Sequence, residues 1–100
     1  MTELPLDIPA DHPAYAGHFP GRPILPGVVL LDAAIGALAR RQGLEARGQL
    51  KSAKFLNPVL PGEALDLHFA VSASGDFRFE IRSRERRVAS GVLALPESAP

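Results

Sequence analysis

The chain has 100 residues, of which 46% are hydrophobic and 22% are charged, and its 11 basic residues balance 11 acidic ones. This composition predicts a single compact domain over residues 1–100 without a separate cofactor-binding domain, and the zero net charge argues against nucleic acid or an anionic membrane as a partner. The absence of cysteine excludes disulfides, thiolate metal ligands and a cysteine nucleophile.

The N-terminal segment shows no export signal. Three acidic residues and three prolines occupy the first 15 positions, where a signal peptide would have a basic start and an apolar core. The longest apolar stretch, over 24–39, is interrupted by Asp32 and is shorter than the roughly 18 to 20 residues that cross a bilayer. We therefore expect a cytoplasmic protein. Residues 1–9 alternate loosely in hydropathy, which predicts a short first strand, and their prolines confine it to a sheet edge or a terminus.

A loop and then a helix are predicted next. Residues 11–27 contain four prolines and three glycines, a composition that excludes regular structure and predicts a tightly folded loop. The apolar run over 28–41 ends in two arginines, which complement the helix dipole, and Gly43 suits the position after the last turn. We predict a buried helix that begins at Gly27.

The second half of the chain is predicted to form four strands, over 49–56, 64–72, 77–83 and 88–95. Alternating apolar and polar residues support the middle two strands most clearly. Residues 74–76 and 84–87 are expected to form turns. One buried helix followed by four strands predicts an α+β fold, in which an antiparallel sheet wraps around the helix.

A histidine on the loop and a carboxylate in the helix are the candidate catalytic pair. A neutral imidazole at His18 could take the proton next to a thioester carbonyl, and free N–H groups at Gly27 could bind the carbonyl oxygen. Burial in the apolar helix would raise the pKa of Asp32, which would let it protonate a leaving hydroxyl. On these residues alone, a structural Asp32 bonded to the backbone and a packing or capping role for His18 stay open.

The other histidines and glycines predict neither a metal nor a phosphate site. His12 precedes a proline and His68 falls on the polar face of a strand, so both are expected to be structural. The three histidines lack the close spacing of metal ligands. The glycines of the loop lack the Lys-Ser/Thr ending of a phosphate loop. We expect neither a metal nor a cofactor.

Two segments resemble a known family. His18-Phe-Pro-Gly-Arg-Pro-Ile-Leu-Pro-Gly-Val28 closely resembles the signature of the hot-dog β-hydroxyacyl-[acyl-carrier-protein] dehydratases. Residues 53–63, Ala-Lys-Phe-x-x-Pro-Val-Leu-Pro-Gly-Glu, resemble the strand and turn that follow the central helix in that family. The resemblance implies a hot-dog fold with His18 as the base and Asp32 as the acid. The substrate contacts that it implies are Phe19, Pro26, Gly27 and Val28.

The resemblance also implies a reaction and partners. The expected reaction removes water from a β-hydroxyacyl thioester on acyl carrier protein to give the trans-2-enoyl thioester, in biosynthesis of the fatty acid, polyketide or aryl polyene type. The expected assembly is a homodimer or higher oligomer, in which His18 of one subunit faces Asp32 of the other. Two alternatives stay open: a hot-dog acyl thioesterase, and a non-catalytic acyl-binding or partner subunit of another dehydratase. One departure from the family is Gly36, because the family often has a glutamine four residues after the acid.

Overall fold

The computed structural model describes residues 2–6, 8, 26–44, 48–60, 62–84 and 86–95. Most of the segment rich in proline and glycine lies outside these residues, and so do His12, His18 and Phe19. The elements in chain order are β1 (Thr2–Leu6), α2 (Gly27–Gln42), β2 (Gln49–Phe55), β3 (Leu65–Val71), β4 (Phe77–Ser83) and β5 (Arg86–Ala94). The predicted helix and strands are therefore confirmed in type and order.

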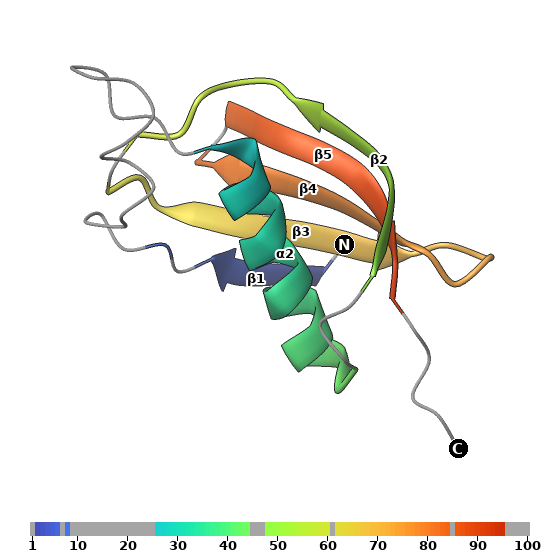
Figure 1. Cartoon of the computed structure of the whole chain (residues 1–100). Coiled ribbons are helices and arrows are strands. Elements are labelled where there is room, and N and C mark those ends of the chain that lie inside the picture. The colour runs from blue at the N-terminus through green and yellow to red at the C-terminus, as the bar shows by residue number, and fades with distance from the viewer. Residues whose placement is uncertain are drawn as a thin grey trace.

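The five strands form one antiparallel sheet in the order β1-β3-β4-β5-β2. Figure 1 shows the sheet curving behind α2, which lies across one face of it. Strand β1 carries Pro5 and lies at one edge of the sheet, as the prolines of residues 1–9 predict. Strand β2 forms the other edge. This arrangement confirms the α+β prediction of a sheet wrapped around one helix.

The helix begins and ends where the sequence predicts. Pro26 precedes the first turn with extended backbone angles, φ −61° and ψ 143°. After the last turn, Gly43 has a left-handed φ of 67°, and its N–H donates to the carbonyl oxygens of Ala39 and Arg40. A left-handed residue after a helix is the position at which glycine is preferred, because it has no Cβ to clash.

Only one side of α2 is buried. The buried residues are Leu30, Ala34, Ala37, Leu38 and Ala39. On another side, Val28 is 72% exposed and Asp32 is also exposed. The prediction that the helix is buried all round, with Asp32 inside, is therefore wrong for the single chain. The reason is that one sheet covers only one side of a helix, and hydropathy does not say what covers the rest.

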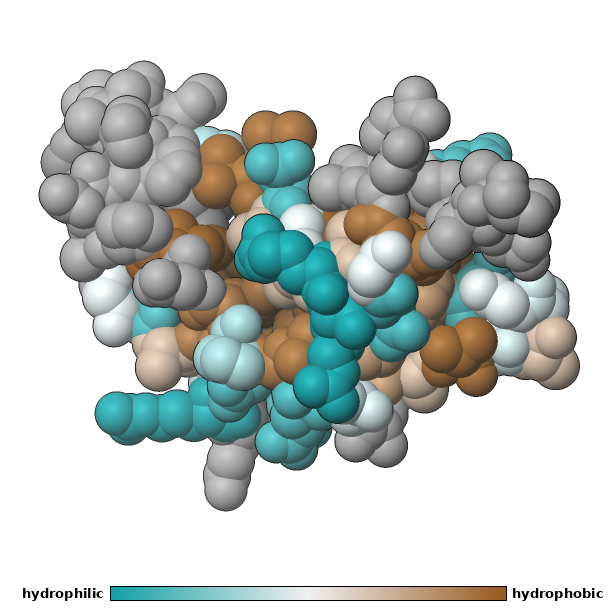
Figure 2. All heavy atoms as spheres, turned by 90° about the horizontal axis from the view of Figure 1, so that it is seen from below, coloured by the Kyte–Doolittle hydropathy of each residue, from teal (hydrophilic) through white to brown (hydrophobic). Residues whose placement is uncertain are grey.

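The core lies between α2 and the inner face of the sheet. Alternate residues of β3 and β4 point inward, and the buried ones are Leu65, Leu67, Phe69, Phe77, Phe79 and Ile81. Val71, the last residue of β3, is 56% exposed. In Figure 2, which shows the face seen from below, hydrophilic side chains cross the middle of the molecule and line its lower margin, and apolar side chains lie on either side of them.

The β4–β5 hairpin is tighter than the sequence predicts. Strand β5 begins at Arg86, two residues earlier than expected, because Ser83 already pairs with Arg86. Arg84 supports this short turn with a left-handed φ of 57°. A register shift follows in the pairing of β5 with β4, and at that point the carbonyl of Val88 accepts the N–H of Leu56 at 2.8 Å. The hairpin is thereby joined to the segment that follows β2.

Candidate active site

The first turn of α2 presents two backbone donors. The N–H groups of Val29 and Leu30 both donate to the carbonyl oxygen of Pro26, at 3.1 and 3.3 Å. The N–H groups of Gly27 and Val28 have no acceptor within the described part of the chain, and no side chain caps the helix. Two free donors at the positive end of a helix dipole can bind an oxygen atom that gains negative charge during a reaction.

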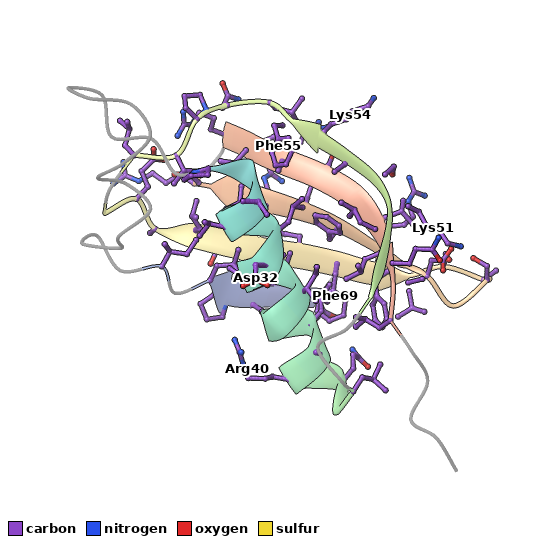
Figure 3. All side chains as sticks on the ribbon, in the orientation of Figure 1. Asp32, Arg40, Lys51, Lys54, Phe55 and Phe69 are labelled. Carbon is purple, nitrogen blue, oxygen red and sulfur yellow. The ribbon has the colours of Figure 1, made fainter. Side chains whose placement is uncertain are left out.

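Phe55 explains why the first residue of the helix is glycine. A Cβ built on Gly27 would lie 2.6 Å from Cε1 of the Phe55 ring, closer than packed carbon atoms approach. Figure 3 shows Phe55 beside the start of α2. The ring belongs to the second of the two family-like segments, and the sequence pattern alone does not predict its contact with Gly27 in the first. The structure shows that the end of β2 covers one side of the helix start.

Asp32 lies five residues beyond Gly27 in the same helix. It is exposed and forms no ion pair or hydrogen bond with the other described residues. Asp32 follows Val28 by four residues, so the two lie one turn apart on the same side of α2. His18 and Phe19 lie outside the described residues, and the pairing of His18 with Asp32 therefore stays a prediction.

Glu63, the last residue of the second family-like segment, forms hydrogen bonds with the β4–β5 hairpin. Its Oε1 accepts the N–H of Leu60 at 2.9 Å, and its Oε2 accepts the hydroxyl of Ser83 at 2.6 Å. Arg86 donates to the same Oε2 at 2.5 Å. Burial raises the pKa of Glu63, but these three hydrogen bonds and the charge of Arg86 outweigh it and lower the pKa below the ordinary value of 4.5. Glu63 is thus held as a carboxylate with a structural role.

A pocket of about 640 Å³ lies beside Glu63, and it is lined by Leu60, Gly62, Glu63, Ala64, Ser83, Arg84 and Arg86.

The N–H and side-chain amide of Asn57, two residues after Phe55, donate to the carbonyl oxygens of Val88 and Arg87. The helix start, the end of β2 and the hairpin therefore form one connected region of the molecule.

The described residues contain no cluster of three or more His, Cys, Asp or Glu side chains that could hold a metal ion. His68 lies on β3 with Nδ1 3.5 Å from Oε1 of Glu3 on β1, so within this part of the chain it takes part in cross-strand pairing. In the same part of the chain, no helix has the length and apolar character needed to span a bilayer.

Comparison with known sequences supports the resemblance seen in the two segments. A family model for the ApeI dehydratase, ApeI-like, matches residues 1–92. The 3-hydroxyacyl-[acyl-carrier-protein] dehydratase FabZ of Haemophilus influenzae (strain PittEE) is 41% identical over 75 residues, which are 65% of this chain and 50% of the relative. FabZ of Novosphingobium aromaticivorans is 50% identical over 64 residues, or 54% of this chain and 40% of the relative. The chain spans about half the length of the curated relatives it matches.

Solved structures show the same fold. The dehydratase heterocomplex ApeI:P from Xenorhabdus doucetiae aligns with a TM-score of 0.73 and 26% identity, over 95% of this chain and 86% of that chain. A variant of the fluoroacetyl-CoA-specific thioesterase FlK aligns with a TM-score of 0.68 over 96% of this chain and 88% of its own, but at 12% identity it shares the fold alone. The predicted hot-dog fold is confirmed.

Proposed function

Since the chain belongs to the ApeI-like dehydratase family, we propose that it removes water from a β-hydroxyacyl thioester carried by acyl carrier protein. The observation that carries this proposal is the first part of α2, where two N–H groups without an acceptor among the described residues precede a carboxylate on the same helix. A helix rises 1.5 Å per residue, so Gly27 and Asp32 differ by about 7.5 Å along its axis. This spacing leaves room for a carbonyl oxygen at one end and a β-hydroxyl at the other, each at hydrogen-bond length.

The reaction divides between three groups. The N–H groups of Gly27 and Val28 bind the thioester carbonyl oxygen and make the adjacent C–H more acidic. His18 takes the α-proton, and the electron pair of that C–H bond forms the new double bond between the α and β carbons. The bond from the β carbon to the hydroxyl breaks, and Asp32 donates the proton with which the hydroxyl leaves as water. The product is the trans-2-enoyl thioester.

Mass spectrometry of the carrier protein tests the reaction class. Incubation with β-hydroxyacyl carrier proteins of several chain lengths is expected to remove one water from the carrier-bound acyl group. Release of the acyl chain as free acid would instead identify a thioesterase. An unchanged carrier would indicate a non-catalytic partner subunit.

Two variants test the assigned roles. His18→Ala and Asp32→Asn are each expected to lower the dehydration rate by about 10²- to 10⁴-fold, the usual contribution of a general base or acid. Asp66→Asn is the matched control, because Asp66 is exposed on β3 and outside the site. A loss of less than about tenfold in either site variant would remove that residue from the mechanism.

A further inference from the structure

Gly36 and Arg40 follow Val28 and Asp32 along α2 at the same four-residue spacing. The four residues are spaced four apart, so each follows the previous one by about one turn. Gly36 has no side chain, and a Cβ built there would lie 3.3 Å from Nη1 of Arg40. The guanidinium of Arg40 therefore takes up the space that a side chain at position 36 would need.

The Arg40 side chain turns back toward the candidate acid. Figure 3 shows it running beside α2 in the direction of Asp32. Because the guanidinium lies at the level of Gly36, it is about 6 Å beyond Asp32 along the helix axis, at 1.5 Å per residue. Arg40 forms no ion pair or hydrogen bond with any side chain of the described ranges. Its N–H donors are available to a ligand in this single chain.

We propose that Arg40 selects acyl chains that carry a carboxylate about five bonds beyond the β carbon. The inference rests on the proposed function, which places the carbonyl oxygen at Gly27 and the β-hydroxyl at Asp32. The rest of the acyl chain then continues in the same direction, toward Gly36. An extended chain advances about 1.2 Å per bond, so five bonds cover the 6 Å or so from Asp32 to the guanidinium. Arginine binds a carboxylate through two parallel N–H donors.

Arg41 provides the comparison that separates this role from a structural one. Arg40 and Arg41 both lie in the last turn of α2, where a positive charge complements the helix dipole. Both side chains are exposed. Only Arg40 lies on the side of the helix that carries Asp32, so a dipole effect is common to the two arginines and substrate selection is not.

Binding of two unreactive ligands tests the proposal without any catalytic step. Heptanedioyl-pantetheine and heptanoyl-pantetheine have equal chain length, lack the β-hydroxyl, and differ in the terminal carboxylate. The whole chain is expected to bind the heptanedioyl thioester about tenfold to hundredfold more tightly, the range for a hydrogen bond to a charged group. Arg40→Leu is expected to abolish this preference, Arg40→Lys to keep part of it, and Arg41→Leu to keep it fully. Equal affinities in the unmodified protein, no binding of either thioester, or a preference that survives Arg40→Leu would overturn the proposal.

A parallel assay with the 3-hydroxy forms of both acyl groups on carrier protein separates the two proposals. If neither loses water while the binding preference depends on Arg40, the dehydratase function fails and the role of Arg40 stands. If the unmodified protein and Arg40→Leu dehydrate both substrates with the same kcat/KM ratio, the role of Arg40 fails and the function stands. The expected result is a kcat/KM advantage for the carboxylate substrate that Arg40→Leu removes.

Discussion

Glu63 makes the stability of the molecule sensitive to acid. Its carboxylate accepts hydrogen bonds from the Leu60 N–H, the Ser83 hydroxyl and Arg86, and its pKa is below 4.5 in the folded chain. A carboxyl group whose pKa is lowered on folding stabilises the fold above its unfolded pKa. That stabilisation is lost as the pH falls through the folded pKa.

We therefore expect Glu63→Gln to flatten the pH dependence of unfolding below about pH 4.5. The free energy of unfolding, measured with urea between neutral pH and about pH 3, should fall less steeply for Glu63→Gln than for the unmodified chain. Asp66→Asn, which changes an exposed carboxyl group of β3, serves as the control and should leave the slope unchanged. Parallel curves for Glu63→Gln and the unmodified chain would contradict this role.

Two glycine substitutions should shift stability in opposite directions. A Cβ on Gly91 would overlap the carbonyl oxygen of Ser52 and lie 2.8 Å from Cζ of Phe79. Such overpacking costs about 1–3 kcal/mol, so Gly91→Ala should lower Tm. Gly36→Ala meets only the flexible end of Arg40 and removes a helix-interior glycine, so it should stabilise by about 0.5–1 kcal/mol. Thermal unfolding of both variants checks the two signs, and equal shifts would refute the packing argument for Gly91.

At the scale of elements, the sequence predicts what depends on local chemistry. The start of α2 after Pro26 follows from the proline, which is tolerated at the start of a helix but not in its interior, and the end of α2 follows from the left-handed freedom of Gly43. The buried faces of β3 and β4 follow from the alternation of apolar and polar residues along each strand. The start of β5 is missed by two residues because Arg84 adopts a backbone angle that non-glycine residues rarely take. The exposure of Asp32 is missed because it depends on which surface covers the helix.

The β4–β5 hairpin carries four arginines within six residues: Arg82, Arg84, Arg86 and Arg87. It is bonded to the residues just after Phe55, which covers the helix start. A carrier protein delivers its acyl group on a phosphopantetheine arm, and arginine is well suited to bind phosphate. The hairpin is therefore where we expect the carrier to dock.

Arg84→Glu tests docking at the hairpin, because Arg84 is exposed. It should raise KM for a carrier-bound substrate. KM for the same acyl group on free pantetheine should stay unchanged, because free pantetheine lacks both the protein part of the carrier and its phosphate. High salt should reduce the difference in KM between Arg84→Glu and the unmodified chain on the carrier-bound substrate, because salt screens the charge of Arg84. Equal KM values for Arg84→Glu and the unmodified chain on the carrier-bound substrate would place the docking surface elsewhere.

At the scale of the whole molecule, one side of α2 and the β2 edge of the sheet are exposed in a single chain. Val28 and Asp32 are exposed on α2, and β2 is an edge strand whose residues are mostly exposed. An unpaired edge strand presents backbone donors and acceptors to a second chain. A homodimer that joins two sheets and covers this side of α2 would bury Asp32.

Complementation between inactive subunits tests this arrangement. If His18 of one subunit acts with Asp32 of the other, a mixed dimer of His18→Ala and Asp32→Ala has one site with both changes and one site with neither. Co-refolding equal amounts makes half of the dimers mixed, each with one intact site of two, so about a quarter of the unmodified activity should return. Co-refolding His18→Ala with the double variant His18→Ala/Asp32→Ala is the control, because no intact site can form. If differently tagged copies are shown by mass to have exchanged and activity still does not return, the two residues do not meet across a subunit interface.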